Sequence, residues 1–493
     1  MTIKEFHEAL KNKKTSVKGT IVSYLDKIKK ENKNLNAYLE VFAEESMARA
    51  EDIDKRIEEG EEPLELLGVP IAMKDNILIR GHIASAASKI LGNYVASYDA
   101  FVIEKLKKAG VIFLGRTNMD EFAMGSSTEN SAYGPARNPF DSERVPGGSS
   151  GGSAAAVGGG LAMAALGSDT GGSIRQPAAF CGVVGLKPTY GAVSRSGLIA
   201  MASSLDQIGP IAQSVEDAET IFNIISGKDG LDSTSTELGD HGAKPQKRPG
   251  RQADKIGVPK EYFSEGLDLR IKKSIDDIIG KLSKDHEIIE ISLPHTKYAL
   301  DCYYIIVPAE VSSNMARYDG IRYGARQNAP DLLDVYKKSR GEGIGLEVRR
   351  RILLGTYVLS HGYYDAYYSR AQKVRALIKK DFDEVFKKPA RDATPASNAS
   401  RSDTGWHSVV GGVDVIVAPT TPSLPFKIGE KSDPLSMYLS DIYTIPANLA
   451  GIPALSLPIG KIDNLPVGMQ LIAPHFGERR LFGLGREIEK MIK

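Results

Sequence analysis

The chain has 493 residues, of which 42% are hydrophobic and 25% are charged, the balance of an ordinary globular protein. Its 63 lysines and arginines almost match its 62 acidic residues, so the net charge of +1 excludes a strong overall attraction to nucleic acid or to a membrane. Two cysteines favour a reducing compartment without a disulfide framework. We expect a cytoplasmic protein, because the sequence shows neither the apolar region of a signal peptide nor a run as long as a membrane span.

The first 60 residues predict helices. Residues 3–30 carry two apolar stripes at helical spacing, which indicate two helices. Residues 43–59 form a charged helical segment that Gly60 is placed to end. We interpret residues 1–60 as scaffold.

Residues 64–228 predict an α/β core. The apolar run at 66–74 is typical of a buried strand, and residues 111–114 form a second strand pattern. Between them, Asp99 is placed to cap a helix over residues 100–108. A strand, a helix and a strand in this order predict an α/β sheet, whose loops at the strand ends commonly hold functional residues.

Two Gly-Gly-Ser clusters stand within this core, in residues 147–153 and 167–176. The segment between them predicts a helix near 152–157 and a strand near 162–168. Glycine lets backbone amides approach a ligand closely. A hydroxyl in such a loop therefore suits a phosphate clamp or an acyl-transfer nucleophile.

Three other interpretations of the first cluster fit less well. A P-loop requires Lys and then Ser or Thr directly after its last glycine, whereas Ser153 and two alanines follow Gly152. A G-x-S-x-G nucleophile elbow requires a buried strand before it, but residues 138–146 contain two prolines and three charges. A Gly/Ser linker would not continue into the apolar run 154–166. A serine nucleophile remains.

The base for such a serine is a histidine or a lysine. None of the 8 histidines lies between His82 and His241, although a distant histidine could fold into the site. Lys74 ends the predicted buried strand, where loss of solvation would lower its pKa and let the neutral amine act as a base. The residues alone leave both bases open.

The rest of the chain predicts further helices and strands. Residues 257–390 predict a mainly helical region that is rich in tyrosine from 299 to 386, and residues 411–493 return to strand patterns before a closing helix. The stretches 236–254 and 387–410 have the polar composition of surface loops. Expected strands lie at 182–187, 256–259, 286–293, 413–418 and 454–457, and expected helices at 174 onward, 269–282, 299–386 and 479–492.

Lys74, Ser149 and Ser173 resemble the Ser–cis-Ser–Lys triad of the amidase signature family. The resemblance extends over most of the chain, except for the two polar stretches. The segments that carry it are residues 70–75, 147–157, 167–176, 318–324 and 441–451. The last two segments resemble the glutamine-hydrolysing subunits of tRNA-dependent amidotransferases rather than generic amidases. The resemblance implies one large α/β domain over 1–493, with a mixed β-sheet flanked by helices and a helical cover over the active site.

The resemblance also implies roles for individual residues. Ser173 would be the nucleophile, Ser149 the proton relay after a cis peptide, and Lys74 the base. The oxyanion hole would consist of the backbone amides of Thr170, Gly171, Gly172 and Ser173. Free glutamine would be held by Tyr303, Arg351 and Asp441. From the residues alone, Arg349–Arg351 would be read as a solvated basic face, and Arg350 is an alternative to Arg351.

The implied activity is hydrolysis of glutamine, with the ammonia used to amidate Glu-tRNA(Gln) or, as a second acceptor, Asp-tRNA(Asn). The implied partners are the B and C sister subunits of the amidotransferase, with tRNA held mainly by the B subunit. ATP and Mg²⁺ would belong to that sister subunit, and no metal or cofactor is expected on this chain. One alternative is a stand-alone amide hydrolase with the same triad. Another is a non-catalytic glycine-rich binding protein, which would leave the coincidence of Lys74, Ser149 and Ser173 unexplained.

Overall fold

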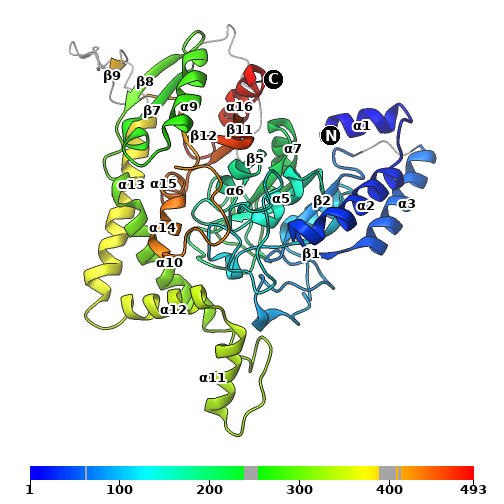
Figure 1. Ribbon diagram of the computed structural model, residues 1–493, viewed down its shortest axis with the longest axis horizontal. Helices are drawn as coiled ribbons and strands as arrows, with labels where there is room; N and C mark the ends of the chain where they lie inside the picture. Colours follow the sequence, from blue (N-terminus) through cyan, green and yellow to red (C-terminus); the bar gives the residue numbers. More distant parts are fainter. Residues whose placement is uncertain (61–63, 238–253, 388–406, 409–411, 493) are drawn as a thin grey trace.

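A computed structural model describes residues 1–60, 64–237, 254–387, 407–408 and 412–492. Within these residues the centre of the fold is one mixed sheet of 12 strands (Figure 1). In spatial order the strands are β1 (Tyr38–Val41), β3 (Ile112–Thr117), β2 (Pro70–Lys74), β4 (Ala164–Asp169), β6 (Gln207–Ala212), β5 (Val184–Lys187), β11 (Ala454–Ile462), β12 (Leu465–Ile472), β10 (Val415–Pro419), β7 (Lys255–Pro259), β8 (Glu287–Ile291) and β9 (His407–Ser408).

The pairing of β2 with β4 sets the position of the site. The two strands run parallel, with Ala72 opposite Ala165 and Met73 opposite Leu166. Every residue of both strands is buried, as expected for parallel strands covered on both faces. Because parallel strands end at the same edge of a sheet, Lys74 at the end of β2 lies beside the last residues of β4.

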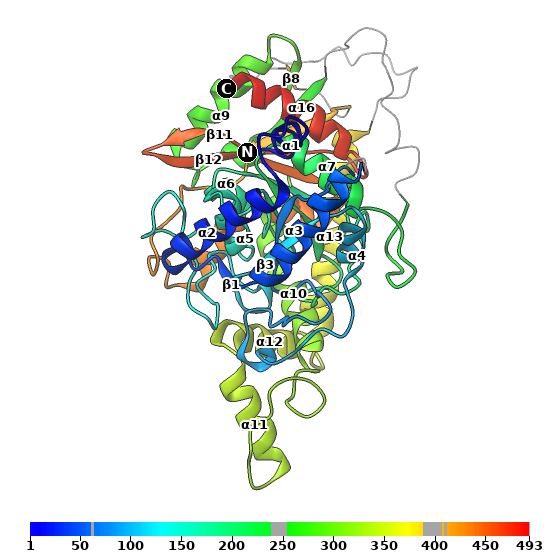
Figure 2. The same cartoon turned by 90° about the vertical axis from the view of Figure 1, so that its right-hand side faces the viewer.

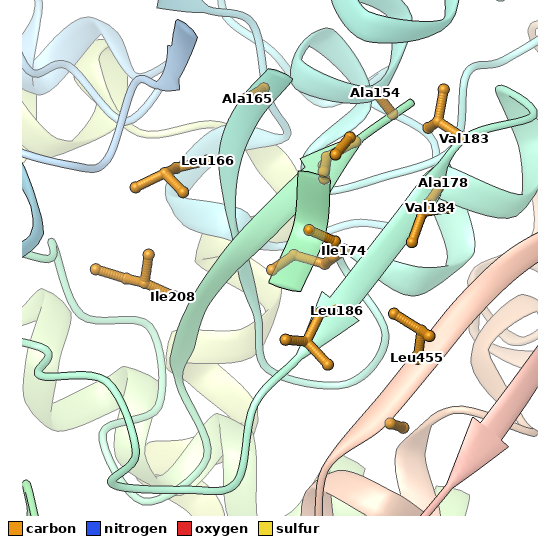
Figure 3. Packing of buried hydrophobic residues seen from close by; sticks show 14 of the residues in the cluster. Ala154, Ala165, Leu166, Ile174, Ala178, Val183, Val184, Leu186, Ile208 and Leu455 are labelled. Atoms are coloured by element: carbon orange, nitrogen blue, oxygen red, sulfur yellow. The ribbon is translucent and has the colours of Figure 1, made fainter. Parts of the chain in front are cut away.

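Short helices rich in small residues pack closely on the centre of the sheet. Helix α5 (Gly151–Gly158) contacts β2 and β4, and α6 (Arg175–Phe180) contacts β11 and β12. Figure 3 shows Ala154, Ile174 and Ala178 among the branched side chains of the strands. At Gly152, the carbonyl oxygens of Asn118 and Ala37 leave no room for a Cβ atom, so only glycine permits this approach.

Further helices flank this centre. Helices α1 (Ile3–Lys11), α2 (Val17–Leu35) and α3 (Ala43–Glu58) lie together at one side, and α4 (Phe101–Lys108), α7 (Val215–Ile225) and α16 (Glu478–Ile492) also lie against the core (Figure 2). At the far side from the N-terminal helices, α9 (Leu269–Leu282) packs against β10, β11 and β12. None of the described helices is both long and apolar enough to cross a membrane.

The cover consists of α10 (Ala299–Met315), α12 (Leu346–Val358) and α13 (Arg370–Phe386), with a π-helical turn at Tyr364–Ser369. Helix α10 packs against α12, α13 and the short helix α15 (Ile445–Ala450). Gly355 of α12 lies against the Pro308 carbonyl of α10, where a side chain would not fit. Helix α11 (Leu332–Gly343) projects away from the body in both views (Figures 1 and 2).

The fold confirms the predicted α/β class and most predicted elements within a few residues. Helix α9 has the predicted bounds. The expected cap at Asp99 is wrong: α4 begins after Ala100 without a side-chain cap, because the Asp99 carboxylate accepts the Arg80 amide at 2.9 Å and pairs with Lys107. Strands β1, β6 and β12 and helix α7 were not predicted.

The structure describes the two polar stretches, 236–254 and 387–410, only in part. Of residues 236–254, the positions 238–253 lie outside the described residues. Of residues 387–410, the positions 388–406 and 409–410 do so as well. Within the second stretch His407–Ser408 form β9, which pairs in parallel with β8, so this part is a strand rather than a loop.

Candidate active site

Lys74 lies fully buried at the end of β2, as its apolar run predicted. Its Nζ atom is 2.8 Å from the Oγ atoms of both Ser149 and Ser150. It is also 2.9 Å from the Ser168 Oγ and 3.2 Å from the Ser168 carbonyl oxygen. Burial lowers the pKa of Lys74 to about 7, although nearby carboxylates, Asp120 foremost, act to raise it. The amine therefore loses its proton near neutral pH rather than near pH 10.5.

The structure thus places a lysine, not a histidine, beside the predicted relay serine. No described histidine is hydrogen bonded to Ser149 or Ser173. The Gly148–Ser149 peptide bond is cis, as the resemblance implied. The Gly148 amide donates to the side-chain oxygen of Gln176 at 2.9 Å, and the Ser150 amide donates to the Ser173 carbonyl at 3.1 Å. These bonds hold the loops of the two serines side by side.

Ser173 lies in the loop between β4 and α6 and is 6% exposed. Asp169 at the end of β4 fixes this loop, because its carboxylate accepts the Ile174 amide at 3.1 Å and pairs with the Arg175 Nε at 3.1 Å. Burial acts to raise the pKa of Asp169, but Arg175 and Asn448 hold it at about 2. A permanent ion pair therefore holds the chain directly after Ser173.

The backbone amides predicted for an oxyanion hole are available. Among the residues that the structure describes, none accepts a hydrogen bond from the N–H groups of residues 170–173. The loop is held by other atoms: the Thr170 hydroxyl donates to Asp206 at 2.7 Å, and the Thr444 hydroxyl donates to the Gly171 carbonyl at 2.6 Å. This loop can offer N–H groups to a negative oxygen without breaking its own bonds.

Asp441 and Tyr303 line the space beside this loop. Burial raises the pKa of Asp441 to about 7, and its Oδ2 accepts a hydrogen bond from the Ser126 hydroxyl. Its Oδ1 is buried and has no hydrogen-bond partner among the described residues; it faces Gly172. The ring of Tyr303 lies against Gly171, where a Cβ atom would be 2.8 Å from it. Both predicted residues therefore lie next to the loop that carries Ser173.

Arg351 is buried on the inner side of α12, so the interpretation as a solvated basic face is wrong for this residue. Its Nε donates to Glu347 at 2.8 Å, and its guanidinium lies 5.1 Å from the Tyr304 ring and 5.5 Å from the Tyr438 ring. Burial acts to lower the pKa of Arg351, but Tyr304 and Glu347 raise it above its usual value. Arg350 is partly exposed and pairs with the same Glu347.

Several residues of the site were missed in the sequence. Ser150 and Ser168 complete the shell around Lys74, and the Asn76 side chain donates to the Ser168 Oγ at 3.0 Å. Ser150 and Ser168 stand inside the glycine-rich segments, so their position was a usable signal. Asp120 follows the predicted strand 111–114, at a strand end of the kind that commonly holds functional residues. Its carboxylate accepts the Thr128 amide at 2.9 Å, and its amide donates to the Ser149 carbonyl at 3.3 Å. Tyr304 and Tyr438, which flank Arg351, were also missed.

A buried lysine that lies at the end of a strand in a large mixed sheet and is bonded to serine hydroxyls is the arrangement of an amidase-signature enzyme. A comparison with family models agrees, because the model described as Amidase matches residues 20–482. The chain belongs to this family, and its fold and amidase chemistry are those that the sequence predicted.

Similarity to individual members of the family is more specific than the match to the family model. The chain is 52% identical to the A subunit of Glutamyl-tRNA(Gln) amidotransferase from Carboxydothermus hydrogenoformans, over 99% of this chain and 97% of the relative. Among solved structures, the A subunit of Glutamyl-tRNA(Gln) amidotransferase from Thermotoga maritima is 41% identical, with a TM-score of 0.78 over 99% of this chain and 94% of that one. The peptide amidase of Stenotrophomonas maltophilia is 26% identical, with a TM-score of 0.77 over 100% and 97% of the two chains.

Proposed function

We propose that the chain is the glutamine-hydrolysing subunit of a tRNA-dependent amidotransferase. The observation that carries this proposal is the buried Asp441 Oδ1, which lacks a partner among the described residues and faces the loop of Ser173. A buried carboxylate oxygen needs a donor, and the α-ammonium group of an amino acid supplies one. Arg351 supplies a guanidinium of the kind that binds a carboxylate. The Asp441 carboxylate and the Arg351 guanidinium together match the α-ammonium and α-carboxylate groups of a free amino acid whose side-chain amide lies at Ser173.

The reaction begins at Ser173. Its Oγ attacks the side-chain amide carbon of glutamine while its proton passes to Ser149 and the proton of Ser149 passes to neutral Lys74. The negative oxygen that forms is stabilised by amides of residues 170–173. Loss of one such donor typically slows acyl transfer by about 10²–10³-fold.

The second half of the reaction reverses the proton path. Protonated Lys74 returns a proton through Ser149 to the nitrogen of the leaving group, the carbon–nitrogen bond breaks, and ammonia leaves. The product on the protein is an ester between Ser173 and the side-chain carboxyl group of glutamate. Water then attacks this ester and gives its proton to Lys74 along the same path. As the ester bond breaks, Lys74 returns this proton through Ser149 to the Ser173 oxygen, which releases glutamate and restores both the Ser173 hydroxyl and the neutral Lys74.

The ammonia would serve a sister subunit. We propose that the B subunit binds Glu-tRNA(Gln), ATP and Mg²⁺, that the small C subunit joins the two larger chains in a heterotrimer, and that the assembly acts in the cytoplasm. Asp-tRNA(Asn) is a second candidate acceptor. The identity to proteins named as the A subunit, along nearly their whole length, supports a multi-subunit assembly. This chain would supply neither the nucleotide site nor the main tRNA site.

A stand-alone amide hydrolase is the competing function, since the peptide amidase has a closely similar fold. The deciding experiment measures ammonia release from glutamine by the purified chain, alone and with the co-expressed B and C subunits. We expect release to require the sister subunits and to disappear in Ser173→Ala. Fast hydrolysis of simple amides by the lone chain, with no activity on glutamine, would show a stand-alone amidase. Activity that survives in Ser173→Ala would refute the mechanism.

A further inference from the structure

A cavity outside the active site is lined in part by a segment to which the proposed mechanism assigns no role. This segment, residues 318–324, is one of the two whose sequence resembles amidotransferase subunits. It follows α10, and its Tyr318 and Tyr323 line the cavity together with Tyr94 and Tyr98 of the loop after residues 89–91. The volume is about 250 Å³. That is below the range of about 300–1,000 Å³ that is usual for small-molecule sites, so it suits a single large side chain.

The structure gives a packing role to the inward-facing residues of segment 318–324, but it gives none to the exposed residues. The Asp319 carboxylate accepts the amides of Ile321 and Arg322 at 2.8 and 3.0 Å, which fixes a tight turn. Gly320 has φ 73° and lies against Ser339, where a side chain would not fit. In contrast, Tyr323 is 54% exposed, and the Arg322 side chain is 73% exposed with only a 3.8 Å approach to Asp319. These bonds define the turn, which presents a tyrosine and an arginine to the outside.

The rim of the cavity is positively charged. Arg317 lines it and donates to the carbonyl oxygen of Asn314 at 3.0 Å, and it forms no ion pair with any residue that the structure describes. Arg322 stands on the adjacent turn. Inside, Leu78, Leu91 and the tyrosine rings supply apolar walls. An apolar interior with such a guanidinium at its rim fits an apolar side chain that is followed or preceded by a carboxylate.

The cavity is also connected to the loop of Ser173. One wall is the segment 197–200, and the next residue, Met201, accepts a hydrogen bond from the Asn314 side chain at 3.1 Å. The Met201 amide donates to Asp206 at 2.9 Å, and Asp206 accepts the Thr170 hydroxyl. An occupant of this cavity therefore lies a short chain of hydrogen bonds away from the proposed oxyanion loop.

We propose that this tyrosine-lined cavity is a docking site for a sister subunit, which inserts one large apolar side chain next to an acidic residue. The inference rests on the proposed function, since only an amidotransferase subunit has such partners. Tyrosine and arginine are enriched at the energetic centres of protein interfaces, where a pocket receives an anchor side chain. The cavity offers four tyrosines, with an arginine at its rim.

The first test is site-specific crosslinking in the assembled protein. The chain carrying p-benzoylphenylalanine in place of Tyr323 is co-expressed with the B and C subunits, irradiated, and analysed by mass spectrometry. The same replacement of Tyr298, an exposed tyrosine outside the cavity, is the matched control. We expect a crosslink from position 323 to an apolar side chain beside an acidic residue in one of the two sister subunits, and none of this kind from position 298. A complex that forms without a crosslink to either sister subunit, or with a crosslink to tRNA alone, would overturn the proposal.

The second test measures affinity. Tyr323→Ala and Arg317→Glu alter exposed side chains and should leave the thermal unfolding temperature unchanged. We expect each to weaken binding of the sister subunits at least about tenfold, and Tyr298→Ala to leave it unchanged. Equal affinity of all variants refutes the docking site while the proposed function stands. Absence of binding by the unaltered chain refutes the proposed function and the docking site with it.

Discussion

Replacing Lys74 by methionine tests whether this lysine is neutral in the folded chain. Burial lowers its pKa to about 7 from 10.5, its ordinary value, which we take for the unfolded chain. Between these two values the unfolded chain binds one more proton than the folded chain at this position. The free energy of unfolding therefore rises with pH across this window. The destabilising effect of burying Lys74 is complete below pH 7 and absent above pH 10.5. In Lys74→Met this pH dependence is removed.

The magnitude follows from the size of the window. One proton changes the free energy of unfolding by about 1.4 kcal/mol per pH unit. Since Lys74 is half titrated near pH 7, the unaltered chain should gain about 2.3 kcal/mol over Lys74→Met between about pH 7 and pH 9. The variant leaves Ser149 and Ser168 with fewer partners, which shifts its stability at every pH but not the slope.

The assay is urea unfolding at about pH 7, 8 and 9 for both proteins, and the quantity compared is the difference in their free energies of unfolding. Lys187 is a second fully buried lysine whose pKa burial lowers to about 7. It is present in both proteins, so its contribution cancels. Lys187→Met is the matched control, which should remove a similar slope while leaving Lys74 in place. Parallel pH curves for the unaltered chain and Lys74→Met would refute the neutral lysine and, with it, the role of Lys74 as a base.

Four further predictions concern the substrate charges and the ion pair behind Ser173. Asp441→Asn should raise KM for glutamine at least about tenfold with a smaller change in kcat, because it removes a charge that binds substrate and transition state alike; a change in kcat alone would contradict this role. Since burial raises the pKa of Asp441 to about 7, its carboxylate is protonated below that pH. KM in the unaltered assembly should therefore fall as pH rises from about 6 to about 8, and a flat profile in Asp441→Asn is the control. Arg351→Lys should also raise KM, because an ammonium cannot reproduce two parallel bonds to a carboxylate; an unchanged KM would point to Arg350 instead. Asp169→Asn should lower the free energy of unfolding by about 3–5 kcal/mol, since it leaves Arg175 buried without its charge partner. Chemical unfolding measures this loss, and a change below about 1 kcal/mol would show that the pair is dispensable.

Local sequence was enough to predict the parts of the site that depend on one segment at a time. The apolar run before Lys74 predicted a buried strand end, and that strand is β2. The glycine-rich clusters predicted two serines on tight loops, because only glycine permits the close backbone approach seen at Gly152. The amidase-signature class and its function followed from motif resemblance, and the family match and the relatives at about half identity agree with it.

Only the tertiary structure decided which distant groups meet and which become buried. The sequence left histidine open as the base; the parallel pairing of β2 with β4 put Lys74 against Ser168 and the cis-serine loop. Arg351 stands in a run of three arginines that is typical of solvent-exposed surface, and it is buried because Tyr304 and Tyr438 close over it from two other segments. Short-range patterns record which residues prefer to be buried or to turn. They do not predict the long-range packing that removes water from a charged group. This loss of water lowers the pKa of Lys74. The same packing leaves the Asp441 Oδ1 buried without a partner among the described residues.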